Sequence, residues 1–154
     1  MLKWLFTLFV ALVVSLYAIK GQSAEKTPGS AAELTVTVDG LRNDQGLLRL
    51  AIYNNPEDFP EGKDTGDADV PIKAGVAVAK FMRLIPGRYA IAVHHDENGN
   101  KDMDTFLGFP LEGFGFSNNA KAGISGPPDF EEASFDVGAA DTAIRLTIVY
   151  WASP

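Results

Sequence analysis

The stretch from His94 to Asp104 places oxygen-bearing side chains at every second position, the spacing at which a tight loop surrounds a hard cation. The candidate metal ligands are Asp96, Asn98, Asn100, Asp102 and Asp104. Calcium takes about six to eight oxygen ligands, and the loops that bind it supply them from alternate positions. Three carboxylates and two amides would also offset much of the charge of the ion. The spacing therefore predicts a structural Ca²⁺ site.

Two positions distinguish this loop from the calcium site of helix-loop-helix proteins. Lys101 is at the sixth position, where the sharp turn favours glycine, and Leu107 is at the twelfth, where a bidentate glutamate belongs. A shorter loop of this kind would complete its ligand shell with a remote carboxylate. The same segment offers several: Glu112, Asp129, Glu131 and Glu132. The alternative is a solvated turn, because Asp, Asn and Gly are common in turns whether or not an ion binds.

The only two histidines, His94 and His95, are adjacent and lie beside Asp96. They suggest a zinc site or a general base oriented by a carboxylate. Adjacent residues of a strand point to opposite faces, so both rings cannot easily bind one metal. We expect His95, on the apolar face, to cap the edge of the core with one ring nitrogen bonded to the backbone. Ser117 and Ser125 have no evident base partner, so nucleophilic catalysis is unsupported.

Alternation of apolar and polar residues is the dominant pattern from Glu33 onward. It predicts strands over residues 34–38, 48–53, 76–84, 88–94 and 143–151, and a short edge element over 70–75. No segment predicts a helix of three turns. We therefore expect an all-β fold, an antiparallel Greek-key β-sandwich of prealbumin-like or Ig-like type with about seven strands. An open barrel is the alternative that this pattern does not separate from a sandwich.

The periodicity ends after His94 for about 40 residues, which is long for a connection in a compact domain. This segment contains half of the ten phenylalanines: Phe106, Phe109, Phe114, Phe116 and Phe130. A segment so rich in apolar rings should pack on something, so we expect one long ordered loop. Phe114 and Phe116 would form either a lid on the core, which we favour, or a recognition platform. Asn118 and Asn119 would hold the shape of the loop by bonding to its backbone.

The N-terminal residues 1–24 have the layout of a signal peptide. Lys3 precedes an apolar run from Trp4 to Ala18, and small or polar residues follow as far as Ala24. We expect cleavage between Ala18 and Ala24, a flexible lead over residues 25–32 and a β-sandwich domain over residues 33–154. An uncleaved membrane anchor is the alternative, but the apolar run is short for a span that needs about 20 residues. The predicted location is periplasmic or secreted, with no membrane span after cleavage.

The chain is acidic, with 13 Lys and Arg residues against 20 Asp and Glu residues and a formal charge of -7. Removal of the N-terminal segment, with its two lysines, would take that charge from -7 to -9. Phosphate binding needs the opposite sign, so nucleic acid and anionic membrane surfaces are poor partners. The absence of cysteine excludes disulfides and a lipid-modified N-terminus. We expect a monomer that meets an unknown envelope or extracellular partner.

Several motifs occur in the order in which a known family carries them. They are Leu-x-Pro-Gly-x-Tyr at 84–89, His95-Asp96-x-Asn98-x-Asn100, Phe109-Pro110-x-Glu112-Gly113-x-Gly115-Phe116-Ser117-Asn118-Asn119, and Gly126-Pro127-Pro128-x-Phe130. Together with the signal peptide they resemble the bacterial exported family catalogued as Domain of Unknown Function twenty-one forty-one. The first motif is also similar to a hairpin of prealbumin-like and carboxypeptidase-regulatory-like sandwich modules. The resemblance implies an envelope or secreted sandwich and no established activity.

A second resemblance gives the alternative function. Some small transthyretin-like sandwiches are hydrolases that use histidine and arginine at a shared cleft, which implies a hydrolase using His94 or His95. The C-terminal tetrapeptide typical of that group is absent, since this chain ends Tyr150-Trp151-Ala152-Ser153-Pro154. The leading prediction is an exported non-catalytic module of the bacterial cell envelope, in which a calcium-type loop stabilises a long interaction loop.

Overall fold

The structure is a computed structural model that describes residues 32–123 and 125–151. Its strands are β1 (Ala32–Asp39), β2 (Leu47–Tyr53), β3 (Gly66–Val70), β4 (Ala77–Leu84), β5 (Gly87–Asp96), β6 (Thr105–Phe106), β7 (Phe109–Pro110), β8 (Gly113–Phe116), β9 (Phe135–Val137) and β10 (Thr142–Thr147). Two short helical turns are η1 (Ser117–Asn119) and α1 (Phe130–Ala133). The predicted signal peptide lies outside the described residues, as does the predicted lead apart from Ala32, which begins β1.

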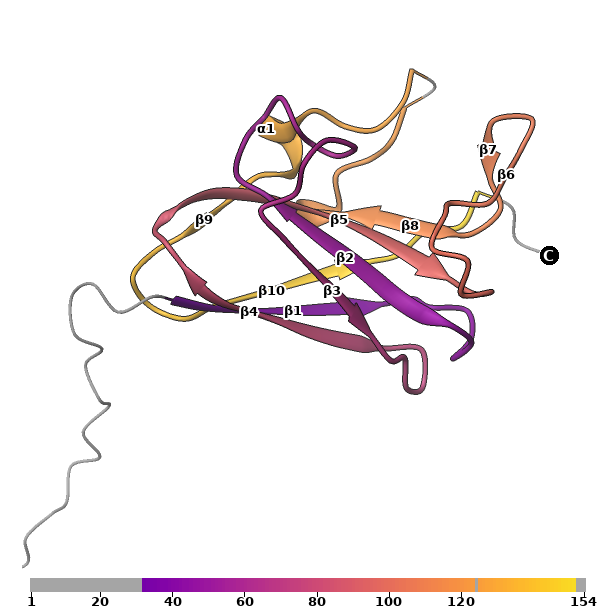
Figure 1. Ribbon diagram of the computed structural model, residues 1–154, viewed down its shortest axis with the longest axis horizontal. Coiled ribbons are helices and arrows are strands. Elements are labelled where there is room, and N and C mark those ends of the chain that lie inside the picture. The colour runs from indigo at the N-terminus through magenta and orange to yellow at the C-terminus, as the bar shows by residue number, and fades with distance from the viewer. Residues whose placement is uncertain (1–31, 124, 152–154) are drawn as a thin grey trace, which may run out of the picture.

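Two sheets pack face to face (Figure 1). The smaller has the strand order β10-β1-β4, and the larger has the order β3-β2-β5-β8, with β9 paired to the start of β5. Strands β6 and β7 form a separate hairpin that projects beyond the sheets. The predicted β-sandwich is confirmed, and α1 is only four residues long. Within the described part of the chain, no helix has the length and apolar character needed to cross a membrane.

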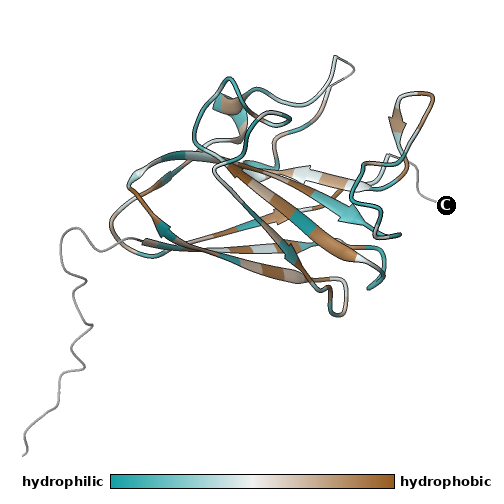
Figure 2. Cartoon of the chain, viewed as in Figure 1, coloured by the Kyte–Doolittle hydropathy of each residue, from teal (hydrophilic) through white to brown (hydrophobic). Residues whose placement is uncertain are grey.

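The core between the sheets follows the alternation seen in the sequence. On β1, Leu34, Val36 and Val38 are fully buried, while the residues between them are half-buried. Leu50 of β2 and Ile91 of β5 enter the same core from the larger sheet. Apolar and polar bands alternate along these strands (Figure 2). Burial of apolar surface, at about 25 cal/mol per Å², is the main source of stability for such a sandwich.

One strand pairing departs from the expected antiparallel arrangement. Strand β10 runs parallel to β1, with Val36 opposite Ile144 and Val38 opposite Leu146. A hairpin turn forces its two strands to be antiparallel, but β10 follows the long excursion after β5. Its direction is therefore set by packing of its apolar face rather than by a turn.

Two strands outside the predicted ones lie at the two edges of the larger sheet. Strand β8 alternates glycine with phenylalanine, and β3 carries Gly66, Asp67 and Asp69. Glycine and aspartate are poor strand formers, so pairing with neighbouring strands decides these elements. A Cβ atom at Gly113 would lie 2.5 Å from Cε1 of Tyr150, so β8 passes that ring only because glycine is there. Of the expected edge element over 70–75, only Val70 is in a strand.

The long segment after β5 is ordered, as its phenylalanines predicted. Phe116 and Phe130 are buried with Tyr53 in a second apolar cluster, on the outer face of the larger sheet. Phe114 is half-buried and packs against this cluster. In contrast, Phe106 and Phe109 of the β6–β7 hairpin are 65% and 50% exposed. The rings of this segment therefore form a lid near α1 and an exposed apolar surface at the hairpin.

Two asparagines fix the turn that follows β8. Nδ2 of Asn118 donates to the carbonyl of Ser134 over 2.7 Å, and Oδ1 of Asn119 accepts the N–H of Thr147 over 2.8 Å. Both residues have positive φ, which asparagine tolerates better than most residues. The predicted role of these side chains in shaping the loop is confirmed.

Candidate metal centre

Asp96 ends β5 and is the most deeply placed of the five predicted metal ligands, at 2% exposed. The N–H of Gly99 donates to its Oδ1 over 2.7 Å, and the N–H of Lys101 donates to its Oδ2 over 3.0 Å. A carboxylate oxygen has lone pairs for more than one partner. The backbone therefore fixes this carboxylate inside the turn and leaves each oxygen able to accept another contact.

Asn98 and Asn100 repeat this arrangement along the loop. Oδ1 of Asn98 accepts the N–H of Asn100 over 2.9 Å, and Oδ1 of Asn100 accepts the N–H of Asp102 over 2.8 Å. Each is an Asx turn, in which a side-chain oxygen holds the backbone two residues ahead. The side-chain oxygens at alternate positions are thus oriented by the chain itself.

The loop turns sharply through two residues with left-handed backbone. Gly99 has a φ of 76° and Lys101 a φ of 72°. Glycine adopts this conformation freely, whereas a lysine is strained there by about 1 kcal/mol. Nη1 of Arg49 donates to the carbonyl of Lys101 over 2.5 Å and helps to hold that peptide in place. The sixth position therefore has the backbone conformation of a cation loop although it lacks the usual glycine.

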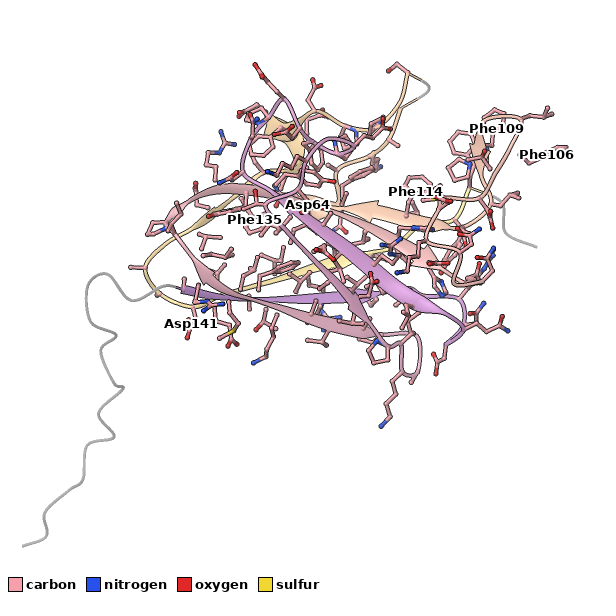
Figure 3. The ribbon with its side chains drawn as sticks, viewed as in Figure 1. Asp64, Phe106, Phe109, Phe114, Phe135 and Asp141 are labelled. Carbon is pink, nitrogen blue, oxygen red and sulfur yellow. The ribbon has the colours of Figure 1, made fainter. Side chains whose placement is uncertain are left out.

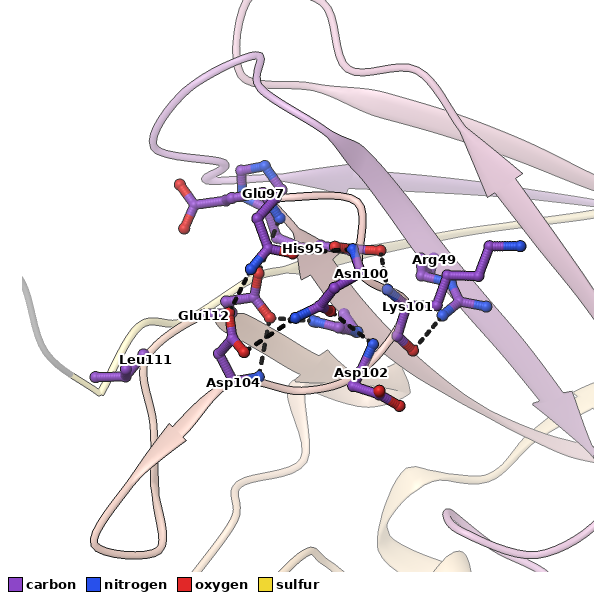
Figure 4. A network of polar contacts seen from close by, with 12 residues as sticks. Arg49, His95, Glu97, Asn100, Lys101, Asp102, Asp104, Leu111 and Glu112 are labelled. Atoms are coloured by element: carbon purple, nitrogen blue, oxygen red, sulfur yellow. Dashed lines mark hydrogen bonds and ion pairs between the residues drawn. The ribbon is translucent and has the colours of Figure 1, made fainter.

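Asp104 lies across the loop from Asn100 (Figure 4), and the amide groups of both asparagines bond to it. Nδ2 of Asn98 donates to its Oδ2 over 2.6 Å, and Nδ2 of Asn100 donates to its Oδ1 over 3.1 Å. Asp102 joins this network only through its backbone N–H, which donates to Oδ1 of Asn100, and the Asp102 side chain is exposed. The side chains of Asn98 and Asn100 thus meet Asp104, the Asp96 carboxylate is held by the backbone of the loop, and the Asp102 carboxylate lies on the surface.

Glu112 is the remote carboxylate that approaches the loop. It is 4% exposed, and its Oε1 accepts the N–H of Glu97 over 2.9 Å. Its Oε2 accepts the N–H of Asp104 over 3.1 Å (Figure 4) and lies 2.7 Å from Nε2 of His94. One buried side chain therefore joins the two ends of the loop.

The other remote carboxylates serve α1 instead. Asp129 and Glu132 form the capping box at the start of this helix, each bonding to the backbone of the other. Glu131 forms an ion pair with Arg88 over 2.7 Å. Of the four acidic residues that the sequence offered, only Glu112 contacts the loop.

The metal ligands that the loop offers are all oxygens, and few of them are charged. Two carboxylates and two amide oxygens are available, together with the carbonyl of Asp102 at the seventh position, where such loops use the backbone. Within residues 32–123 and 125–151, no three His, Cys, Asp or Glu side chains gather in a metal-binding group. Any ion held here would therefore depend on amide and backbone oxygens, which suits Ca²⁺ and not zinc.

The two histidines lie on opposite faces of β5, as their adjacency predicted. His95 is fully buried, and its Nε2 lies 2.9 Å from the carbonyl of Gln45, as expected for a ring that caps the core. Its Nδ1 lies 2.6 Å from the hydroxyl of Tyr150. A carbonyl only accepts, so Nε2 carries the proton and Nδ1 accepts from Tyr150. With both nitrogens engaged and no exposure, His95 cannot meet a substrate.

His94 lies on the outer face of the sheet, directly opposite Arg49 in the β2–β5 pairing. Both residues line the same depression of the surface. Among the residues that the structure describes, Nδ1 of His94 has no hydrogen-bond partner, while Nε2 is held by Glu112. A histidine oriented by a buried carboxylate and open on its other nitrogen is a possible general base.

An ion pair anchors the first residue after β5. The guanidinium of Arg42 bonds to the carboxylate of Glu97, and Nδ2 of Asn43 donates to the same carboxylate over 2.5 Å. The hydrogen bond from Arg42 lowers the pKa of Glu97 below its usual range, against the opposing effect of burial. The same guanidinium lies 4.5 Å from the centre of the Tyr150 ring, and burial raises the pKa of Tyr150. The loop therefore starts from a rigid charged cluster.

Comparison with known proteins identifies the family. Residues 36–145 match the family model described as "Uncharacterized protein conserved in bacteria (DUF2141)". The chain belongs to this family. The match covers all of the larger sheet, most of the smaller sheet and every residue of the 96–104 loop. No curated protein and no solved structure matches the chain.

Proposed function

We propose that this DUF2141 protein is an exported, non-catalytic module of the bacterial cell envelope whose 96–104 loop binds Ca²⁺. The ion would stabilise the long segment after β5 as an interaction surface. The observation that carries the proposal is the buried Asp96 carboxylate, held on both oxygens by backbone N–H groups of its own loop. A buried carboxylate with spare acceptor capacity, beside more side-chain oxygens at alternate positions, is the arrangement that a hard cation needs.

The residues present fit calcium in the following way. Asp96, Asn98 and Asn100 would offer side-chain oxygens that the backbone already orients, and Asp102 would offer its carbonyl. Asp104 now accepts the amide groups of Asn98 and Asn100. An ion would take the place of these two donors and offset the negative charges of Asp96 and Asp104. The expected affinity is that of extracellular calcium modules, with a dissociation constant of about 10⁻⁴ to 10⁻³ M.

The β6–β7 hairpin is the element that the ion would stabilise. Its base is closed by the N–H of Leu111, which donates to the carbonyl of Asp104 over 2.8 Å. Phe106 and Leu107 at its tip are 65% and 82% exposed, and Phe109 stacks on Trp151 with the ring centres 5.1 Å apart. Exposed apolar groups of this kind mark interaction sites. Fixing Asp104 would therefore order the surface that meets a partner.

Thermal unfolding of the protein purified from cells that express the full chain tests the calcium proposal. We expect about 10 mM Ca²⁺, added after chelation, to raise the unfolding temperature by a few degrees, as binding to the folded state requires. Mg²⁺ should do less, because it tolerates few protein ligands. Asp104→Asn should abolish the shift and Asp102→Asn should keep it. An unchanged unfolding temperature, or an equal shift in Asp104→Asn, contradicts the proposal.

A hydrolase is the second candidate, favoured by one observation. His94 is oriented by Glu112 and lies opposite Arg49 on a surface depression. No serine, threonine or cysteine is found among the described residues that line it. The reaction would therefore use His94 to activate water, with Arg49 beside the developing negative charge. Arg49 is already bonded to Asp69 over 3.0 Å, which weakens this role.

Turnover of activated carboxylic and phosphoric esters distinguishes the two candidates. A hydrolase would lose activity by about 100-fold or more in His94→Gln, because general base catalysis contributes about that much. The non-catalytic module would show the same background rate in the wild type and in His94→Gln. A rate that depends on His94 would replace our first proposal with the second.

A further inference from the structure

The outer face of the larger sheet carries a groove of about 1050 Å³, next to the loop described above. Strands β3, β2, β5 and β8 form its floor. The segment 60–64, the β6–β7 hairpin and the segment 122–127 contribute to its lining. A volume of this size is at the upper end of the range for small-molecule sites.

The floor of the groove is graded from acidic to aromatic across the strands. One cross-strand row runs from Asp67 through Ala51 and Ala92 to Phe116, according to the strand registers. The two alanines are half-buried and present only methyl groups, so nothing large stands between the carboxylate and the ring. With strands spaced about 4.8 Å apart, the row spans about 14 Å.

The aromatic end is built from rings that already contact each other. Phe114 and Phe116 have ring centres 6.2 Å apart in an edge-on arrangement, and both line the groove. Phe109 and Trp151, stacked on each other, also line it. Figure 3 shows Phe114 above the larger sheet and Phe109 farther out on the hairpin. Such rings offer apolar contact area together with attraction for a cation.

The acidic end carries unbalanced negative charge. Glu61, Asp64 and Asp67 all line the groove, and no ion pair to any of them occurs within the described part of the chain. The one arginine of the lining, Arg49, is paired with Asp69. Figure 3 places Asp64 above the same sheet as Phe114. A bound group at this end should therefore be positively charged.

We infer that the groove binds a small organic cation with an apolar body. Its amine or ammonium head lies among Glu61, Asp64 and Asp67, and its body lies over Ala51 and Ala92 against the rings of Phe114 and Phe116. Because the row is acidic at Asp67 and aromatic at Phe116, the ligand can bind in only one direction along it. The carboxylates and rings assigned to the ligand here lie outside the 96–104 loop, so this inference is tested without Ca²⁺.

Three probes that share one body test the charge requirement: phenylhexylamine, phenylhexanol and phenylhexanoate. They are titrated into the ¹⁵N-labelled full-chain product in the presence of a chelator, so that the outcome is separate from that of the calcium proposal. We expect saturable shifts at the amides of Ala51, Ala92 and Phe114 with the amine. The alcohol should bind about tenfold more weakly, because a charge-assisted contact is lost, and the carboxylate should not bind. Equal binding of amine and alcohol, or shifts elsewhere, overturns the inference.

Variants of the groove provide the second arm. The double variant Asp64→Asn and Asp67→Asn should bind the amine about tenfold more weakly. The control is Asp136→Asn, which removes one carboxylate charge on the remote strand β9 and should leave the affinity for the amine unchanged. Ala92→Leu fills the floor on the face away from the core between the sheets, beside the second apolar cluster, and should abolish binding while the protein stays folded. Amine binding that survives Ala92→Leu overturns the inference. So does a groove that takes an acetylated Lys-Phe-Lys-Phe peptide and not the amine, which would assign it to a peptide.

Discussion

Nε2 of His94 lies 2.7 Å from Oε2 of Glu112, and this contact joins the outer face of the larger sheet to the 96–104 loop. The same carboxylate accepts the N–H groups of Glu97 and Asp104, at the two ends of that loop. Glu112 therefore connects β5, the loop and the start of β8. The shape of the proposed calcium site depends on this one buried side chain.

Replacement of Glu112 by glutamine should destabilise the protein by about 1–3 kcal/mol, the cost of leaving buried donors without a partner. The amide NH₂ group would face backbone N–H groups that it cannot accept from. The loss should appear in chemical denaturation, together with faster hydrogen exchange at Glu97 and Asp104. The control is Glu131→Gln, since Glu131 is 69% exposed and its ion pair with Arg88 contributes little. Equal effects of the two substitutions would contradict the role of Glu112.

Replacement of Lys101 by glycine should stabilise the protein by up to about 1 kcal/mol. Left-handed backbone at Lys101 is strained, and relief of that strain should exceed the entropy that glycine adds to the unfolded chain. The measurement is the free energy of unfolding by denaturant. Lys63→Gly is the matched control, because Lys63 does not have a positive φ and glycine there should be neutral or destabilising. A destabilised Lys101→Gly variant would show that the loop has another backbone conformation.

Glu97 should contribute to the loss of folding stability at low pH. Its hydrogen bond with Arg42 lowers its pKa in the folded state below the ordinary value of 4.5. A carboxylate with a lowered folded pKa adds stability that is complete above the unfolded pKa and is lost as the pH falls through the folded pKa. The free energy of unfolding should therefore fall less steeply between about pH 5 and pH 3 in Glu97→Gln than in the wild type. A slope unchanged in Glu97→Gln would contradict the assignment.

Tyr150→Phe should cost about 1–3 kcal/mol, because it leaves Nδ1 of the buried His95 without its donor. It also removes the acceptor for the N–H of Arg42, which lies 3.1 Å from the hydroxyl. Tyr89→Phe is the comparison, since the hydroxyl of Tyr89 bonds the carbonyl of Ile85, an exposed turn residue. The loss there should be smaller, because water can replace the hydroxyl. Chemical denaturation of both variants measures the two losses of unfolding free energy. A larger loss in Tyr89→Phe than in Tyr150→Phe would contradict the proposed tautomer of His95.

The sheet positions with alternating apolar residues could be predicted from the sequence because burial on one face requires that period. Leu34, Val36 and Val38 are the clearest case. Strand β8 could not be predicted in the same way, since Gly113 and Gly115 have low strand propensity and are there to let other groups approach closely. The parallel pairing of β10 was missed for a different reason: no local turn encodes the direction of a strand that returns after a long excursion.

At the candidate site, the residue types and their spacing were visible, but their geometry was not. Hydrogen bonds join Asn98 and Asn100 to Asp104, and the loop backbone holds Asp96; that these residues bind Ca²⁺ stays a prediction. Whether Asp102 faced inward depended on the backbone at Lys101, which no residue preference indicates. Glu112 was one of four candidate remote carboxylates, and only the pairing of β8 with β5 places it against the loop. The groove was missed because its floor residues lie on four different strands.

A ¹⁵N chemical-shift titration with Ca²⁺ tests the central claim most directly. The account predicts saturable shifts at the amides of Gly99, Lys101 and Asp104, with a dissociation constant of about 10⁻⁴ to 10⁻³ M and smaller changes in the β6–β7 hairpin. In Asp104→Asn these shifts should disappear. Amides of the 96–104 loop that do not move at about 10 mM Ca²⁺, or that move only in proportion to ionic strength, would contradict it.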